Sequence, residues 1–358
     1  MEGTLFFAGG FLFDAVMVDR IDETPMLLQQ FAYLVLTGAL LALTQYYALK
    51  QREPPRALRK VWSYTDHAIH FMLGTLLNAY TIFYFQSASG LTAVGFLLVV
   101  AALLAVNELP RFHRLGPVMV YALYSICLTS YFAYLIPVRA HSVAPWMFYC
   151  AVGLSLIPIA LFVRVLGVWS GNPQYGLRMA GLPALGVQAL FVLSYALRIA
   201  PPVPLAVKEI GIYHDVRKDP EGRGKLLSHE SHGLRFWQKG DQNYLEREGD
   251  KVWVFARVFA PRGFHDTIYA AWFYDHPTRG WSQVHRLGLK VTQSGERGFA
   301  TEAFLTSPPE GKYRVEIQSA DGRAMGLLRF EVTRDPSDEP RLFTEDLSLS
   351  RGPKDKRD

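Results

Sequence analysis

Four polar side chains lie inside stretches of the sequence that are otherwise apolar, and they are the first candidates for chemistry. His67, His70 and Asn78 are spaced by three and eight residues, so on a helix they share one face. Asp14 lies in another apolar stretch. Burying such groups in hydrocarbon costs several kcal/mol unless they are paired. They therefore predict either a polar centre inside a membrane or hydrogen bonds that hold helices together.

The spacing of His67 and His70 also resembles half of a metal or haem site, because a helix brings both rings to one side. The other apolar stretches supply no obvious further ligands. We therefore expect no cofactor and no metal.

The second half of the chain contains no recognisable catalytic arrangement. Both cysteines of the chain, Cys127 and Cys150, belong to the first half. The second half has no Gly-x-Ser-x-Gly elbow, no P-loop and no dinucleotide fingerprint. His229 and His232 have a metal-like spacing, but the segment around them is weakly patterned. The sequence leaves enzymatic activity uncertain and favours its absence.

Aromatic residues are dense in this second half and suggest a surface for a partner. Trp237, Tyr244 and Trp281 are the candidates for contact with a sugar or a protein. The alternative is that they fill the core, because β-strands select aromatic residues for packing. Trp272, in the middle of an apolar run, is expected in the core.

The chain changes character at residues 198–205, where three prolines stand within four residues. Residues 1–200 carry 12 Lys or Arg and 8 Asp or Glu, whereas residues 201–358 carry 25 and 24. Prolines end a helix because they lack an N–H group and clash with the preceding turn. A membrane domain is therefore expected before this segment and a water-soluble domain after it. The soluble half is nearly neutral, which argues against a nucleic-acid partner.

Seven apolar stretches are candidates to cross a bilayer, which takes about 20 residues each. They are residues 3–18, 26–49, 68–85, 91–106, 117–138, 146–163 and 179–197. Lys and Arg favour the cytoplasmic side, and residues 50–60 carry five of them. Arg111, Arg114 and Arg178 fall in later loops on the same side. The N-terminus is therefore expected in the cytoplasm and the soluble half outside it.

The soluble half is patterned for short strands rather than helices. Alternating residues predict strands at 211–216, 234–238, 251–260, 267–274, 284–291, 298–305, 313–319 and 327–333. This number of short strands predicts an antiparallel β-sandwich of immunoglobulin-like type. The predicted domains are a transmembrane helical domain at 1–200, a proline-rich hinge at 201–207, an extracytoplasmic β-sandwich at 208–335 and a disordered polar tail at 336–358.

Motifs in both halves carry a family resemblance. They are Gly-Gly-Phe-Leu-Phe-Asp at 9–14, Asp-Arg-Ile-Asp at 19–22, Pro-Pro-Val-Pro-Leu at 201–205, Glu-Ile-Gly-Ile-Tyr-His at 209–214 and the strands at 271–274 and 311–316. With them the chain resembles bacterial multi-pass inner-membrane proteins that end in a periplasmic domain of unknown function, family 2914. The resemblance implies an inner-membrane location and a periplasmic C-terminal domain. It implies no reaction.

Together these features favour a membrane protein that presents a periplasmic β-sandwich to an envelope protein or a glycan. The alternative is a transporter, or an intramembrane enzyme, with its polar centre on the first and third spans. The lipid bilayer is the one certain neighbour of such a chain. Its oligomeric state is left open.

Overall fold

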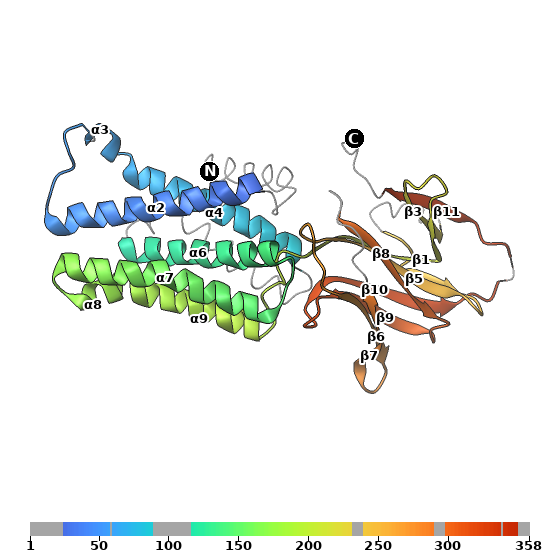
Figure 1. Ribbon diagram of the computed structural model, residues 1–358. Helices are drawn as coiled ribbons and strands as arrows, with labels where there is room; N and C mark the ends of the chain where they lie inside the picture. Colours follow the sequence, from blue (N-terminus) through green and yellow to red (C-terminus); the bar gives the residue numbers. More distant parts are fainter. Residues whose placement is uncertain are drawn as a thin grey trace, which may run out of the picture. The chain divides into compact units, whose positions relative to one another are not determined.

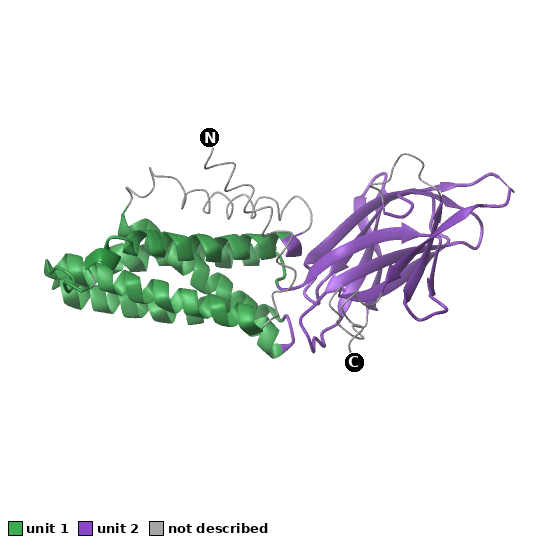
Figure 2. Ribbon diagram, turned by 90° about the horizontal axis from the view of Figure 1, so that it is seen from above, with its two compact units in different colours: residues 1–85, 91–140, 144–203 green, residues 86–90, 141–143, 204–358 purple. Residues whose placement is uncertain are grey.

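The computed structural model describes residues 24–57, 59–88, 116–230, 239–289, 298–337 and 339–349. The chain forms two compact units (Figure 2). The helical unit comprises residues 1–85, 91–140 and 144–203, and the β unit comprises 86–90, 141–143 and 204–358. The main division, between residues 203 and 204, falls inside the segment predicted to be a hinge.

The described helices of the first unit lie side by side as a bundle (Figure 1). They are α2 Thr24–Lys50, α3 Arg59–Trp62, α4 Thr65–Ser87, α6 Pro117–Ala140, α7 Pro145–Ser170, α8 Pro173–Gly176, the π-helical turn η2 Leu177–Gly181 and α9 Leu182–Ala196. Among the described residues, five segments are long and apolar enough to cross a membrane, the last of them running continuously from Pro173 to Ala196.

These five segments coincide with five of the seven predicted spans. The predicted spans at 3–18 and 91–106 lie outside the described residues. The described part of the chain therefore has fewer spans than the seven predicted, and that number is not confirmed.

A tight turn joins α7 to α8 and reverses the chain. Gly171 has a left-handed backbone (φ 72°), and its N–H donates to the carbonyl of Val168. Glycine is favoured there because a Cβ atom would strain this conformation. The Asn172 side chain then accepts a hydrogen bond from the N–H of Gln174 and so caps α8. The reversal lets α9 pack alongside α6 and α7.

The β unit contains eleven strands within the described residues. They are β1 Ala206–Tyr213, β2 Asp215–Lys218, β3 Gly224–Glu230, β4 Asn243–Glu246, β5 Lys251–Phe259, β6 Ile268–His276, β7 Gly280–Leu289, β8 Phe299–Thr306, β9 Gly311–Gln318, β10 Ala324–Arg334 and β11 Phe343–Leu349. They form sheets of order β1-β5-β8, β4-β10-β9-β6-β7 and β11-β3-β2. Strands β5 to β10 match predicted strands, whereas the predicted strand at 211–216 spans the end of β1 and the start of β2.

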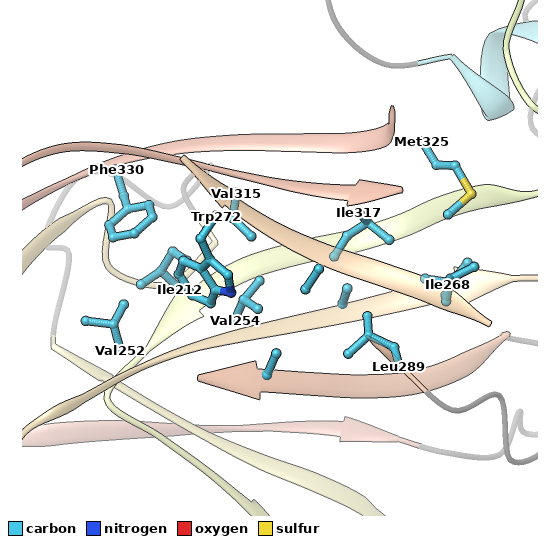
Figure 3. Close-up of a cluster of buried hydrophobic side chains, with 14 of the residues drawn as sticks. Ile212, Val252, Val254, Ile268, Trp272, Leu289, Val315, Ile317, Met325 and Phe330 are labelled. Carbon is cyan, nitrogen blue, oxygen red and sulfur yellow. The ribbon is translucent and has the colours of Figure 1, made fainter. Parts of the chain in front are cut away.

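The first two sheets share one apolar core, as a β-sandwich requires. Trp272 of β6 is fully buried at its centre. Val315 and Phe330 reach it from β9 and β10, and Ile212 and Val254 from the facing sheet (Figure 3). The all-β prediction is therefore confirmed. The prediction that the strands are all antiparallel is wrong at one place, because β4 runs parallel to β10.

The predicted disordered tail is also partly wrong. Residues 343–349 form β11, which pairs antiparallel with β3. Its side chains are mostly exposed, so the alternation that reveals a half-buried strand is missing. The strand with which β11 pairs is β3, which lies more than a hundred residues earlier in the chain. The predicted strand at 234–238 lies outside the described residues.

Candidate functional site

A cavity of about 650 Å³ opens at one end of the helical unit. The end of α2 contributes Thr44 and Gln45, and the first two turns of α4 contribute Asp66, His67 and His70. The remaining walls are Leu41, Ala48, Ile69, Phe71, Gly116, Pro117 and Val120. The last three belong to the start of α6 and the residue before it. The cavity therefore lies where α2 ends and α4 and α6 begin.

The cavity brings together only part of the predicted polar centre. His67 and His70 both line it, one helical turn apart. Asn78 lies two turns farther along α4 and does not line it. Asp14 lies outside the described residues. Gln45 was missed, although it is a buried glutamine in an apolar helix, and its side-chain oxygen accepts a hydrogen bond of 3.3 Å from the Tyr175 hydroxyl.

A second polar cluster is buried deeper in the bundle, and sequence reasoning missed it completely. The amide nitrogen of Gln188 on α9 donates to the hydroxyls of Ser125 (3.0 Å) and Thr129 (2.7 Å) on α6. Thr129 in turn donates to the hydroxyl of Ser155 on α7 at 3.0 Å. All four residues are buried. Small hydroxyl residues and an amide that join three helices act as packing contacts in a membrane.

In the β unit, aromatic and basic side chains alternate on the outer face of the five-stranded sheet. The Arg314 guanidinium carbon lies 4.5 Å from the centre of the Phe273 ring and 4.9 Å from that of Trp281. Arg286 lies 3.9 Å from the centre of the Tyr269 ring. Each contact is close enough for a cation–π attraction. We call these five residues the arginine–aromatic face.

The three predicted partner-binding residues do not lie on one surface of the described structure. Trp281 belongs to the arginine–aromatic face and is partly exposed. Tyr244 is fully buried in the core, and its hydroxyl donates to the carbonyl of Lys251 at 3.1 Å. Tyr244 therefore presents no ring to a partner. Trp237 lies outside the described residues.

Tyr244 instead supports a buried histidine. The His214 ring stacks on it at 4.1 Å between ring centres, and Phe343 covers the ring at 4.9 Å. The Nε2 atom of His214 lies 3.6 Å from Asp241 Oδ2 and 3.8 Å from Glu230 Oε1. The imidazole is only 5% exposed. The segment 209–214 was noted for its resemblance, but the enclosure of His214 depends on residues far from it in sequence.

The pKa values of this pair shift in opposite directions. Burial, reinforced by the nearby Arg341 guanidinium, lowers the pKa of His214 to about 4. Burial raises the pKa of Asp241 to about 7, although Asp241 accepts a hydrogen bond from the Glu230 backbone N–H. Opposed shifts of this kind occur at active sites and also in structural networks. The two rings that enclose His214 favour a structural role.

Ion pairs anchor the segment that leads into β11. Arg341 lies 2.7 Å from Asp250 and 3.3 Å from Asp335, and Arg247 lies 2.8 Å from the same Asp335. These contacts fix the segment that carries Phe343 over His214. Among the described residues, no group of three or more His, Cys, Asp or Glu side chains could hold a metal ion.

The fold and these sites define a protein with several membrane-spanning helices followed by an all-β domain. Residues 265–332 match the family model described as Protein of unknown function (DUF2914). The match covers β6 to β9 and most of β10. The C-terminal region thus carries the domain that the resemblance predicted.

Two solved structures have weak similarity to the chain. An immunoglobulin-like protein from Pseudomonas aeruginosa is 11% identical and covers 33% of this chain and 97% of its own, with a TM-score of 0.20. The alkylpurine DNA glycosylase AlkC from Pseudomonas fluorescens is 12% identical and covers 88% and 99%, with a TM-score of 0.24. Both TM-scores are too low to support a conclusion about fold or function. No curated protein matches the sequence significantly.

Proposed function

We propose that this protein is anchored in a bacterial inner membrane and that its β domain, in the periplasm, binds an envelope protein through the arginine–aromatic face. The orientation is supported by the basic segment 50–60, which joins α2 to α4 and belongs in the cytoplasm. After this segment the chain is expected to cross the membrane five times. The crossings are α4, the span predicted at 91–106, α6, α7 and the segment that ends with α9. The β domain is then on the opposite side of the membrane, and the N-terminus is cytoplasmic.

The observation that carries the binding role is the composition of the arginine–aromatic face. Arginine and large aromatic residues are the types enriched where proteins bind one another. Here they occupy neighbouring positions on β6, β7 and β9, so they form one patch on the sheet. A sheet face with no partner is expected to be more uniformly polar.

The charges of this face favour an acidic protein over a glycan. Arg314 forms an ion pair with Glu316 at 3.0 Å, yet Arg329 lies directly opposite Arg314 on β10. Like charges placed opposite each other are unfavourable unless an anion joins them. Guanidinium groups also cover the aromatic rings, which reduces the area on which a sugar could stack. A partner with carboxylates at this position would relieve the repulsion.

Site-specific photocrosslinking in native membranes tests this role. A photoreactive residue at Gln283, which is exposed on β7 opposite Phe273, is expected to give one dominant protein adduct. The double variant Arg286→Glu and Arg329→Glu is expected to reduce that adduct at least about tenfold, because like-charge contacts at an interface cost several kcal/mol.

The matched control is Lys218→Glu, an exposed charge reversal on β2 in the third sheet, which is expected to leave the adduct unchanged. A photoreactive residue at Thr344 on β11 gives the background. Equal adducts from positions 283 and 344, or an adduct that survives the double reversal, would contradict the proposal.

A further inference from the structure

The cavity of the helical unit has two chemically different walls. Asp66, His67 and His70 lie along the start of α4, and Gln45 adds an amide from α2. Leu41, Ile69, Phe71 and Val120 make the other side apolar. A volume of about 650 Å³ is typical of a site for a small ligand, not of a packing defect. The ligand should therefore be amphipathic.

The position of the cavity within the unit indicates where such a ligand comes from. The cavity lies where α2 ends and where α4 and α6 begin, so it lies at the ends of spans and not at their middle. Span ends lie near the boundary between hydrocarbon and lipid headgroups. Phe71 is 67% exposed at this level, which is ordinary for a side chain that faces lipid. Membrane lipids are thus the amphiphiles with direct access to the cavity.

The polar wall selects the headgroup. Asp66 offers a carboxylate, and carboxylates bind ammonium groups through charge-assisted hydrogen bonds. Imidazole and amide side chains, as in His67, His70 and Gln45, can accept further N–H bonds. Among the described residues that line the cavity there is no Lys or Arg, so these residues offer no cation to an anionic headgroup.

We propose that this cavity binds a phospholipid whose headgroup carries a primary ammonium, with the ammonium on Asp66 and the acyl chains along Leu41, Ile69 and Val120. The phosphate of the same lipid lies toward the basic segment 50–60 that follows α2. This site is independent of any partner of the β domain.

The test uses the purified full chain, depleted of lipid in detergent, and native mass spectrometry with short-chain phosphatidylethanolamine, phosphatidylcholine and phosphatidylglycerol. The choline lipid keeps the positive charge but has no N–H donor. Phosphatidylethanolamine is expected to bind about tenfold more tightly than phosphatidylcholine, which corresponds to about 1.4 kcal/mol. The glycerol lipid, which has no cation, is expected to bind more weakly than phosphatidylethanolamine as well.

Asp66→Asn is expected to bring the ratio of the two affinities close to one while it keeps the shape of the side chain. Thr75→Val, an exposed change on the same helix away from the cavity, is the control and should keep the ratio. Because the ratio is measured within one sample, partial misfolding of a variant does not change it. Equal affinities in the unaltered protein, a preference for phosphatidylglycerol, or an unchanged ratio in Asp66→Asn would each overturn the proposal.

Discussion

Replacing Trp272 with alanine is expected to lower the free energy of unfolding of the β domain by about 4 kcal/mol, the usual cost of removing a large aromatic side chain from a core. Trp272 is fully buried and meets Phe330 edge to face at 5.9 Å between ring centres. Among the described residues its indole N–H has no hydrogen-bond acceptor. Its contribution is therefore apolar packing, which alanine cannot replace. Pulse proteolysis of the full chain in increasing urea would measure the loss.

The matched control is Trp281→Ala on the neighbouring strand β7. Trp281 lies on the outer face of the same sheet and is partly exposed, so its loss is expected to cost about 1 kcal/mol. The same variant should weaken the photocrosslink at position 283, because Trp281 supports Arg314. Similar losses of stability in the two variants would show that the inner and outer faces of the sheet have been assigned wrongly.

Replacing either His214 or Asp241 alone is expected to reveal two opposite dependences of stability on pH. His214 has its pKa lowered from 6.5 to about 4, so its contribution to stability is complete above pH 6.5 and is lost as the pH falls toward 4. Asp241 has its pKa raised from 3.8 to about 7, so its contribution is complete below pH 3.8 and is lost as the pH rises through 7.

In the unaltered protein these two effects largely cancel. Between about pH 4 and 6.5 the unfolded chain carries a proton on the histidine, whereas the folded chain carries one on the aspartic acid. Folding then changes the number of bound protons little, and stability is nearly flat over this range. Folding thus moves a proton from one side chain to the other.

Each single variant removes this balance. Asp241→Asn leaves His214 alone, and its stability is expected to fall by about 3 kcal/mol on acidification from pH 7 to 4. His214→Gln leaves Asp241 alone, and its stability is expected to fall by a similar amount as the pH rises from 4 to 7.5. Urea unfolding of the full chain at several pH values, followed by proteolysis of the β domain, provides the measurement.

His276→Gln changes a partly exposed histidine at the end of β6, whose ring Nδ1 is hydrogen-bonded to Thr278, and should keep the flat profile. If both single variants also keep the flat profile, the pair does not titrate as its burial implies. If the unaltered protein itself loses stability on acidification while His214→Gln keeps a flat profile, the shift at Asp241 is smaller than burial alone would give.

The long helices and strands β5 to β10 follow from local sequence, but the shorter strands, β11 and the sites do not. Runs of apolar residues identified the helices, and alternation identified β5 to β10, including the inward Trp272. Tyr244 was misplaced because its strand β4 has four residues and is paired with β10, far away in the chain. The spacing of His67 and His70 predicted a shared face. Gln45 joins them only because the fold brings the end of α2 and the start of α4 to the same cavity, which local sequence does not encode.

Strand β11 limits where the β domain can be truncated without exposing the edge of a sheet. It pairs with one side of β3, whose other side is taken by β2. A chain cut after residue 336 would leave the backbone N–H and C=O groups along β3 without partners, and such an edge can recruit a strand from another molecule. It would also lose Arg341 and Phe343, which lie against His214. We expect shortened chains to associate edge to edge, so a soluble fragment should extend at least through Leu349.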